Sequence, residues 1–516
     1  MADEPPSDFE TAMKICGFGK FNIYLLLVIV IAIAATTFET SSMSYILPTA
    51  ECDLRLSLLQ KGILNAITYT GTILSAVPWG FIADTMGRKQ VIIYGLLLDG
   101  VFTMGAALSQ NITQLMIFKF LGGFAVCGPF AVIMSYVSEL HGKDHRSQVM
   151  MVVGLMKGTG FLILPILAYF ILPYHIAFKI WVLKFHTWQI FVATTAIPSL
   201  ISAILIVFLP ESPKFLMTKG KNEEALKVFQ IIYAVNTGRN KSEYPIKILS
   251  NEAPFRPPRV SIDSNTKYFR RRSIEAQQNL SEGFKQLRPM FSSPYIVLAV
   301  FVYTMNFFVI MGQNTLRLWL PQIFASLTEF QVKQTTTNPS MCTILEYNVN
   351  KTELLRFDEM TECDVHISAE SYTPNIIVAA VGFFGYIGVA LLVPYLGTKN
   401  ILSIGLGLSV LSNFGMFLSF NYLTVLLASA AFITFSSIAV TTIINVSVDV
   451  FPTTMRTMVV VLVMTFGRLG AVLGNVLFPV LISLGCLPPF LTVGGVIFVA
   501  LIISLFLPNT SKMALR

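Results

Sequence analysis

Long hydrophobic runs separated by short polar stretches make up most of this 516-residue chain. Each run has about twenty residues or more, enough for an α-helix to cross a hydrocarbon layer about 30 Å thick. The pattern predicts twelve membrane-spanning helices. The expected ranges are 21–47, 61–83, 90–109, 113–138, 148–173, 187–209, 294–320, 373–396, 399–419, 421–447, 457–484 and 487–507.

The spacing of these runs divides the chain into two halves. Six spans fall within 21–209 and six within 294–507, on either side of a polar, basic linker at 210–293. Two sets of helices related by a repeat are common in secondary transporters. We therefore expect an all-α membrane protein with two six-helix bundles. The remaining parts are tails at 1–20 and 508–516 and a polar loop at 322–372.

The linker itself has two kinds of sequence. Asn222 begins a stretch with an acidic first turn and regularly spaced apolar residues, which predicts a short amphipathic helix. From about Ser242 to Ser273 the chain is rich in Pro, Ser, Asn and Arg, and this composition predicts disorder.

Charge assigns each loop to a side of the membrane. Only 12% of residues are charged, and the net charge of +8 is concentrated in the linker and in short loops. Cytoplasmic loops carry such an excess of cations, so the linker and both termini are predicted to be cytoplasmic. The acidic loop at 322–372 then lies outside or in a lumen. Since a transmembrane bundle has no basic folded face, nucleic acid is excluded as a partner.

Two glycosylation sequons fall on the predicted outer side. Asn350-Lys-Thr352 lies in the acidic loop, and Asn111-Ile-Thr113 precedes the fourth span. Asn350 and Asn111 are therefore candidate glycosylation sites. Asn111 lies close to the bilayer.

Six cysteines are too few for a disulfide framework. Cys342 and Cys363 share the outer loop, where the compartment is oxidising, so they are the candidate pair. Cys52 near the outer end of the first span competes for either of them. The others are interpreted as ordinary small apolar residues: Cys16, Cys127 and Cys486.

A charged hairpin joins the second and third spans. It contains a glycine, an acid, a second glycine and two cations at fixed spacing: Gly80, Asp84, Gly87, Arg88 and Lys89. A positive-inside turn accounts for the two cations, but not for the spaced glycines and acid. The pattern resembles the loop between helices 2 and 3 of the major facilitator superfamily. Its counterpart in the second half keeps Gly397 and Lys399 without an aspartate.

Further strings narrow the resemblance. Ser138-Glu139 with Arg146, Pro210-Glu-Ser-Pro-Lys214, and Asp449 to Arg456 are similar to the sugar-porter and organic-ion-porter branch. Three others resemble the synaptic vesicle glycoprotein 2 family and its insect relatives. These are Leu47 to Ser57 with Lys61-Gly62, Phe185-His-Thr-Trp188, and Leu318-Trp-Leu-Pro321. The chain departs from that family by carrying Thr36 in place of an acid and Lys119 in place of an arginine.

The resemblance implies a gate at the cytoplasmic helix ends. Asp84 and Arg88 are expected to lock the inner gate, with Asp84 near the positive N-terminal end of helix 11. Two ion pairs are expected beside it, Glu139 with Arg146 and Asp449 with Arg456.

Ionisable residues within the spans are the main candidates for substrate and coupling, because such charges are costly unless paired or hydrated. Glu39 and Lys119 have similar depth, and the resemblance places their helices around the central cavity, so they are expected to pair across it. Proton or substrate competition for this pair would provide coupling. A purely structural salt bridge explains it equally well.

Other intramembrane residues give the expected cavity a positive charge. Lys157 and Arg468 lie near mid-membrane and Arg317 near the outer end, while Asp99 is the one other deep acid besides Glu39. This excess favours an anionic or zwitterionic solute, unless Asp99 binds Lys157 or Arg468. The seventh span also carries amides at substrate-binding spacing, which buried structural amides would explain as well: Asn306, Gln313 and Asn314.

No zinc-ligand spacing, phosphate-binding glycine loop or nucleophile motif occurs in the sequence. We therefore expect neither an enzyme nor a metal or other cofactor. The expected function is secondary active transport of a small organic solute by alternating access, with protons as a candidate coupling ion. The alternative is a vesicle or plasma-membrane binding protein that keeps the fold but transports little. Thr36 and the degenerate second motif favour that alternative, whereas the intact first motif and the deep Glu39–Lys119 pair favour transport.

Overall fold

The computed structural model describes residues 6–174, 176–181, 183–250, 295–334, 340–357, 367–451 and 456–507. Twelve helices in these ranges are long and apolar enough to cross a membrane. The N-terminal half contains α2 (Lys20–Asp53), α3 (Leu58–Met86), α4 (Arg88–Ala107), α5 (Ile112–Glu139), α6 (Lys143–Ile171) and α7 (Thr187–Val207). The C-terminal half contains α11 (Tyr295–Gln334), α13 (Thr373–Leu396), α14 (Thr398–Phe417), α15 (Tyr422–Val450), α16 (Arg456–Ser483) and α17 (Leu487–Phe506).

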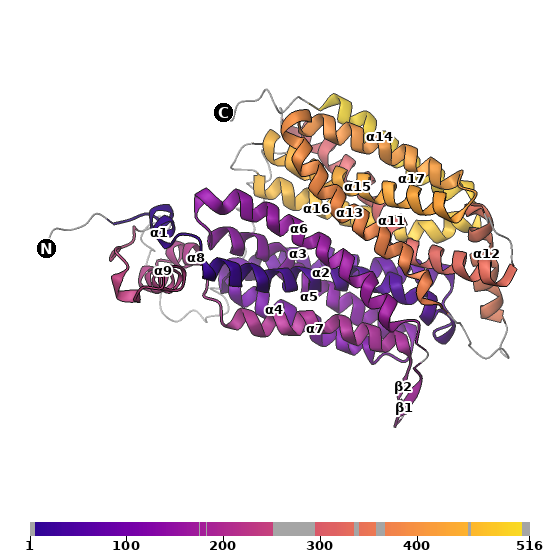
Figure 1. The fold of residues 1–516 in the computed structure, drawn as a ribbon, viewed down its shortest axis with the longest axis horizontal. Coiled ribbons are helices and arrows are strands. Elements are labelled where there is room, and N and C mark those ends of the chain that lie inside the picture. The colour runs from indigo at the N-terminus through magenta and orange to yellow at the C-terminus, as the bar shows by residue number, and fades with distance from the viewer. Residues whose placement is uncertain are drawn as a thin grey trace, which may run out of the picture.

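The two halves are separate bundles that lie side by side (Figure 1). Between them, α3 packs against α16, α2 against α11 and α6 against α13. The bundles meet near α12 (Met341–Phe357), and their ribbons spread apart toward α1 (Phe9–Cys16) and α9 (Asn222–Thr237). We call these two regions the α12 end and the linker end.

Local sequence determines where several spans begin. Ser57 accepts a hydrogen bond from the Gln60 N–H (3.2 Å), and the Gln60 side chain accepts one from the Ser57 N–H (2.9 Å) at the start of α3. Asn111 caps α5 in a similar way, by accepting from the Gln114 N–H. These caps satisfy backbone groups that a helix end leaves unpaired, so the turns between spans are short.

Two spans are longer than predicted. Helix α2 continues six residues beyond the predicted end and α11 continues to Gln334, well into the expected outer loop. That loop also contains α12 and the short 3₁₀ helix η3 (Ala369–Ser371). Hydropathy detects only the part of a helix that contacts lipid, so polar extensions beyond the bilayer are missed.

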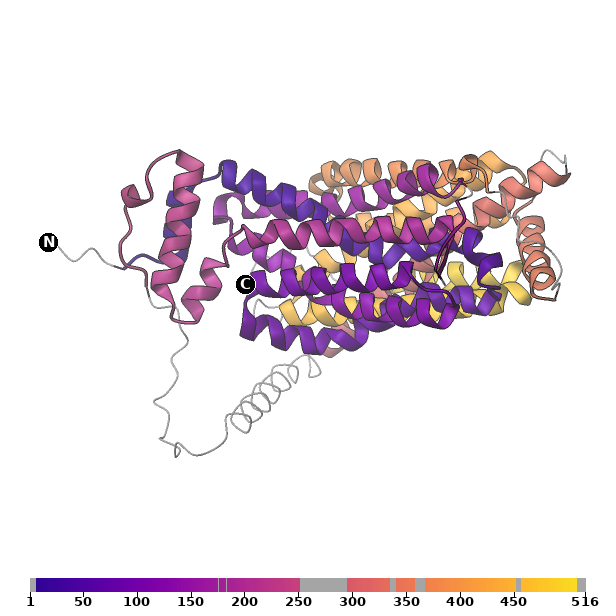
Figure 2. The ribbon, with the colours of Figure 1, turned by 90° about the horizontal axis from the view of Figure 1, so that it is seen from below.

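A small helical unit covers the linker end of the N-terminal half (Figure 2). It consists of α1, α8 (Pro213–Thr218), α9 and the 3₁₀ helix η1 (Lys241–Glu243). The amphipathic helix predicted from Asn222 is confirmed as α9. The prediction of disorder from Ser242 is wrong for its first residues, because Tyr244 donates to the Ala12 carbonyl (2.9 Å) and Ser7 bonds to Ile248 (3.1 Å). The rest of that predicted segment, 251–273, lies outside the described residues.

The predicted disulfide between Cys342 and Cys363 is wrong. Cys342, near the start of α12, is bridged to Cys486, which precedes α17. Helix formation in the supposed loop carries Cys342 to the turn between α16 and α17, a turn whose sequence looks ordinary and apolar. Cys52 is also disulfide-bonded, and Cys363 lies outside the described residues. Cys16 and Cys127 are free and buried.

A β-hairpin connects α6 to α7 at the α12 end. It consists of β1 (Phe178–Ile180) and β2 (Leu183–Phe185), paired antiparallel. The twelve-span pattern does not predict these strands, because it treats the stretch only as a connection between spans.

Candidate functional site

The linker-end motif is organised around Glu211. Its carboxylate accepts the backbone N–H groups of Arg88 and Lys89, each at 3.0 Å, at the first turn of α4. A carboxylate is favourable there because the helix N-terminus is electropositive. Gly87 has φ +103°, and a β-carbon on it would lie 2.4 Å from Glu211 Oε2. The glycine of the motif is therefore required for this cap.

Arg88 connects this helix cap to Glu139 and Phe215. Its guanidinium pairs with Glu139 (Nε to Oε2, 3.3 Å) and lies 4.9 Å above the Phe215 ring. The Ser212 hydroxyl donates a hydrogen bond to the same Glu139 oxygen, Oε2, at 2.5 Å. Glu211 and Ser212 belong to the Pro210–Lys214 string after the sixth span, and Phe215 follows it directly. That segment and the charged hairpin therefore form one contact.

The predicted pair between Glu139 and Arg146 is wrong. Arg146 instead pairs with Glu10 of α1 (2.9 Å) and donates to the Ser138 and His141 carbonyls. Glu139 is occupied by Arg88, which reaches it from the neighbouring helix. Burial lowers the pKa of His141, so the ring beside Arg146 resists taking up a second positive charge.

The gate role of Asp84, Asp449 and Arg456 stays a prediction. Asp84 is in the last turn of α3 and Arg456 begins α16, and both side chains lie outside the described part of the chain. Asp449 is exposed near the end of α15. Gly80 lies one turn before Asp84 and has no atom within 4 Å of the position its β-carbon would take.

Glu39 and Lys119 pair as predicted. Lys119 Nζ lies 2.5 Å from Glu39 Oε2, and Thr103 donates to the same oxygen at 3.0 Å. Both charged side chains are fully buried, at 1% and 0% exposure. A β-carbon at Gly122 would lie 2.3 Å from Glu39 Oε1. The pair is therefore enclosed by α2, α4 and α5 within the N-terminal half, and the expectation that it spans an open cavity is wrong.

Asp99 does not neutralise the central cations. Its carboxylate accepts a hydrogen bond from the Ser199 hydroxyl of α7 (2.5 Å), within the N-terminal half. The alternative in which Asp99 binds Lys157 or Arg468 is therefore wrong.

The three predicted cations lie together between the halves. Lys157 Nζ and Arg468 Cζ lie 5.5 and 6.0 Å from the centre of the same ring, Phe130. Arg317 Cζ lies 4.4 Å above Phe161, one helical turn from Lys157 on α6. None of the three cations forms an ion pair with any side chain that the structure describes. Aromatic faces stabilise cations without neutralising them.

Two of these cations also bond across the interface. Arg317 of α11 donates to the Tyr69 hydroxyl of α3 (3.1 Å) and to Asn314. Arg468 of α16 donates to the Thr72 carbonyl of α3 (3.4 Å). Lys157 belongs to the N-terminal half, so both halves contribute positive charge to this region.

The three amides of the seventh span have different environments. Asn306 is fully buried and donates to the Val463 carbonyl (2.6 Å), which is a structural contact between α11 and α16. Gln313 is partly exposed and donates to the Ser437 hydroxyl at 2.5 Å. Asn314 accepts a hydrogen bond from Tyr69 at 3.2 Å. Gln313 and Asn314 thus remain substrate-binding candidates, and Asn306 is explained by packing.

A second buried carboxylate–lysine pair closes the α12 end. Lys61 Nζ lies 2.6 Å from Glu51 Oε1, with side chains 0% and 1% exposed. Thr352 of α12 donates to the same oxygen at 2.7 Å, and Gln322 of α11 donates to the other oxygen at 3.3 Å. Asn348 of α12 accepts a further bond from Gln322. This network joins two helices of each half, and we call it the α12-end network.

Sequence reasoning missed the α12-end network as a site. The strings that contain Glu51 and Lys61 indicate a family resemblance and no contact. One signal is present in the sequence: a Glu and a Lys stand ten residues apart, on either side of the turn between the first two spans. Thr352 stands out only as the third residue of the Asn350 sequon. In α12 the Asn350 side chain is exposed, and Thr352 is buried in the network.

The two ends of α3 differ in how closely they approach the other half. A β-carbon on Gly62 would lie 2.4 Å from the Asn475 carbonyl of α16, whereas Gly80 has open space. Asn65, Tyr69 and the Thr72 carbonyl all bond to the C-terminal half. Among the described side chains of α3, none beyond Thr72 forms a hydrogen bond across the interface.

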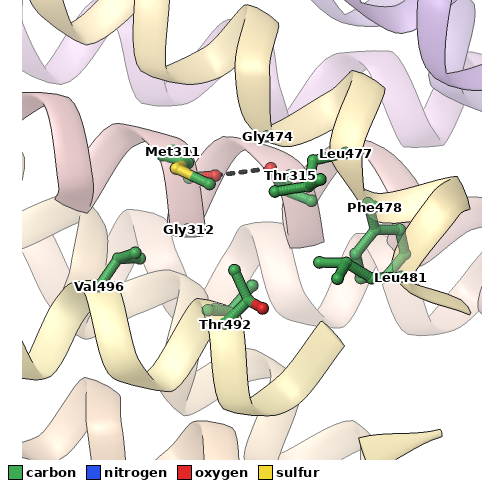
Figure 3. A pocket seen from close by; sticks show the side chains of 10 residues that line it. Met311, Gly312, Thr315, Gly474, Leu477, Phe478, Leu481, Thr492 and Val496 are labelled. Carbon is green, nitrogen blue, oxygen red and sulfur yellow. Dashed lines mark hydrogen bonds between the residues drawn. The ribbon is translucent and has the colours of Figure 1, made fainter. Parts of the chain in front are cut away.

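A small hollow lies elsewhere, between α11, α16 and α17 (Figure 3). Its labelled side chains are mostly apolar, and Thr315 uses its hydroxyl to donate to the Met311 carbonyl (2.6 Å). The hollow lies within one half and contains none of the predicted charged residues, so it is not the candidate substrate site.

Twelve spans in two bundles, with buried charges within and between them, define an integral multi-pass membrane protein with a transporter fold. Residues 27–346 match the family model of the Major Facilitator Superfamily. The chain belongs to this superfamily, whose members are transporters and not enzymes.

Curated relatives support the narrower resemblance. The chain is 26% identical to synaptic vesicle glycoprotein 2C of Mus musculus, over 68% of this chain and 49% of that protein. It is 31% identical to synaptic vesicle glycoprotein 2B of Rattus norvegicus, over 44% of this chain and 34% of that protein. The chain thus matches about half the length of these relatives or less. The predicted likeness to the synaptic vesicle glycoprotein 2 family is confirmed as a distant one.

Solved structures share the fold. The partially occluded inward open conformation of the xylose transporter XylE from E. coli has a TM-score of 0.64 and 15% identity, covering 95% of this chain and 100% of that chain. Its inward open conformation has the same TM-score and 16% identity, covering 96% and 98%. At such low identity the likeness concerns the fold alone. It confirms the predicted twelve-helix architecture.

Proposed function

We propose that this protein is a secondary active transporter that moves a small organic anion by alternating access. The observation that carries the proposal is the asymmetry along α3. From Gly62 to Thr72 this helix is bonded to the C-terminal half, and beyond Thr72 its described side chains are not. Two bundles that close at one end and separate at the other are the arrangement expected of one state in such a cycle.

The excess of cations at the linker end supports a cytoplasmic location for that end. The described state is then open toward the cytoplasm and closed at the outer or luminal side by the α12-end network. Similarity to the synaptic vesicle glycoproteins supports a vesicle or plasma membrane as the location.

The charge of the solute follows from the central cations. Lys157, Arg317 and Arg468 come from both halves, and the two deep acids are bonded within the N-terminal half. A region with several unneutralised cations at membrane depth attracts an anion, because binding replaces the water that would otherwise have to stabilise them. A carboxylate could be held by both arginines, and the Phe130 and Phe161 rings favour a planar body.

The buried Glu39–Lys119 pair is the proposed coupling element. Protonation of Glu39 would cancel the attraction to Lys119 and leave a buried cation, which favours rearrangement of α2, α4 and α5 around it. Protons are therefore the proposed coupling ion. Another solved structure with this fold is that of a D-xylose-proton symporter, which supports this choice.

The test combines binding and transport by the purified protein. Thermal unfolding is measured with benzoate and with its uncharged analogue benzamide. At about 100 times the dissociation constant, benzoate should stabilise the protein by about 2.7 kcal/mol, and benzamide should not. Arg468→Gln should abolish this shift, and Lys227→Gln, which removes an exposed cation from α9, should retain it. Equal stabilisation by benzamide would contradict the anion assignment.

Uptake into sealed proteoliposomes then separates a transporter from a binding protein. Metabolite profiling of cells with and without the chain supplies the solute panel. We expect accumulation of a carboxylate that rises with an imposed pH gradient and is lost in Glu39→Gln. Flat uptake together with saturable binding would favour the non-transporting alternative and leave the anion site intact.

A further inference from the structure

The hairpin between α6 and α7 presents the one strongly exposed tryptophan of the chain. Trp181 is 95% exposed at the tip, whereas Trp79, Trp188 and Trp319 are at most 8% exposed. Trp181 also has φ +57°, which is uncommon for a residue other than glycine. A large apolar side chain held outward in a strained turn indicates a surface that is covered by something outside the chain.

The two strands give the hairpin one apolar and one cationic face. Phe178 pairs with Phe185 and Ile180 pairs with Leu183. Lys179 pairs with Lys184. Because alternate side chains of a strand point to opposite faces, the four apolar residues share one face and the two lysines the other. Phe178 and Ile180 are exposed, so the N-terminal half does not cover the apolar face.

The hairpin is fixed to the N-terminal half. The Gln110 side chain accepts the Lys184 N–H (3.0 Å) and donates to the Lys184 carbonyl (3.1 Å). At its base, the Thr187 hydroxyl accepts the Ile176 N–H at 2.9 Å and donates to the Tyr174 carbonyl. The hairpin therefore keeps its orientation without a partner, and binding through it costs little ordering entropy.

Its position relates it to the membrane. The spans α6 and α7 end and begin on either side of it, so it leaves the bundle where the hydrocarbon layer ends. In Figure 1 it projects sideways from the N-terminal half at the α12 end, across the direction of the spans. Tryptophan is enriched at membrane–water interfaces, and lysines beside it contact lipid phosphates. A lipid surface therefore fits both faces.

We propose that β1, Trp181 and β2 lie on the bilayer surface at the α12 end. Trp181 and the apolar face enter the interfacial layer, and Lys179 and Lys184 contact headgroup phosphates. Because Gln110 fixes the hairpin to α4 and α5, this contact holds the N-terminal half in the lipid plane. The proposal concerns only the bilayer contact and does not depend on transport.

Tryptophan fluorescence tests this proposal directly. Wild-type protein and Trp181→Phe are reconstituted in nanodiscs of phosphatidylcholine, with or without bromine on the upper acyl chain. The difference between the two proteins isolates the emission of Trp181. We expect brominated lipid to quench this emission strongly and the bilayer to protect it from acrylamide in the water. Unchanged thermal unfolding of Trp181→Phe serves as the folding control.

Two outcomes would overturn the proposal. Quenching of Trp181 by acrylamide and not by brominated lipid would place the hairpin in water. Protection from both quenchers would show that protein, such as a second copy of the chain, covers it.

As a second readout that keeps Trp181, Ile180→Cys is labelled with an environment-sensitive dye. Its emission should shift to shorter wavelength on transfer from a lipid-free amphipol to nanodiscs, and no shift would also contradict the bilayer contact.

Discussion

The N-terminal half contains two buried carboxylate–lysine pairs with nearly the same geometry and different surroundings. Glu39–Lys119 is enclosed by helices of that half, with Thr103 as its third partner. Glu51–Lys61 has Thr352 as its third partner, and this residue belongs to the other half. The same chemistry therefore serves two purposes. The first pair is the proposed coupling element within one bundle, and the second bonds the two bundles together at one end.

The largest effect is expected from removing one member of the enclosed pair. Lys119→Met leaves Glu39 buried without its counter-charge, which should lower the free energy of unfolding by about 3–5 kcal/mol. The double variant Glu39→Gln/Lys119→Met removes both charges and should recover most of that loss. Chemical denaturation in detergent checks both. A single variant as stable as the wild type would show that Glu39 takes up a proton without cost.

Loss of the Cys342–Cys486 bridge should come next. The bridge fixes α12 beside the turn before α17 and so supports Thr352 in the α12-end network. Cys342→Ser should lower the free energy of unfolding by about 2–4 kcal/mol. Cys486→Ser should do the same, and the double variant should cost no more than either single one. Additive effects of the two substitutions would contradict the bridge.

Matched threonine substitutions test whether the two pairs have different roles. Thr352→Val and Thr103→Val each remove one hydrogen bond to a buried carboxylate, at a cost of about 1–3 kcal/mol. Only Thr352→Val should also increase the reaction of a cysteine placed at Asn65, between the halves, with an impermeant maleimide. The assay uses a background without the free Cys16 and Cys127. If the cysteine reacts equally in the two variants, the two pairs do not differ in how they hold the halves together.

The smallest effect is expected at the linker end. Arg146 and Glu10 pair with side chains 28% and 38% exposed, and such exposed pairs contribute about 0.2–1 kcal/mol. Glu10→Gln should therefore change thermal unfolding only slightly. A loss as large as that of Lys119→Met would show that α1 is an integral part of the bundle.

The fold can be predicted from the sequence because every span needs about twenty mostly apolar residues to cross the bilayer. Apolar runs of about twenty residues or more predict all twelve helices, and the charged hairpin at Gly80 indicates the family. Ion pairs and disulfides are harder to predict, because they depend on which helix ends become neighbours. The similar membrane depth of Glu39 and Lys119 predicts their ion pair correctly. Arg146 binds Glu10 of the tail and Cys342 binds Cys486, because α1 and α12 form where the sequence showed only polar connections.

Distances from pulsed electron resonance show whether the two halves close at one end as they open at the other. Spin labels are placed on α4 and α14 at the linker end (Gln90 and Asn400) and, in a second protein, at the α12 end (Leu108 and Leu418). Each pair is measured with and without Glu51→Gln, which weakens the α12-end network. We expect the α12-end distance to lengthen while the linker-end distance shortens. Distances that stay fixed, or that change in the same direction, would contradict it.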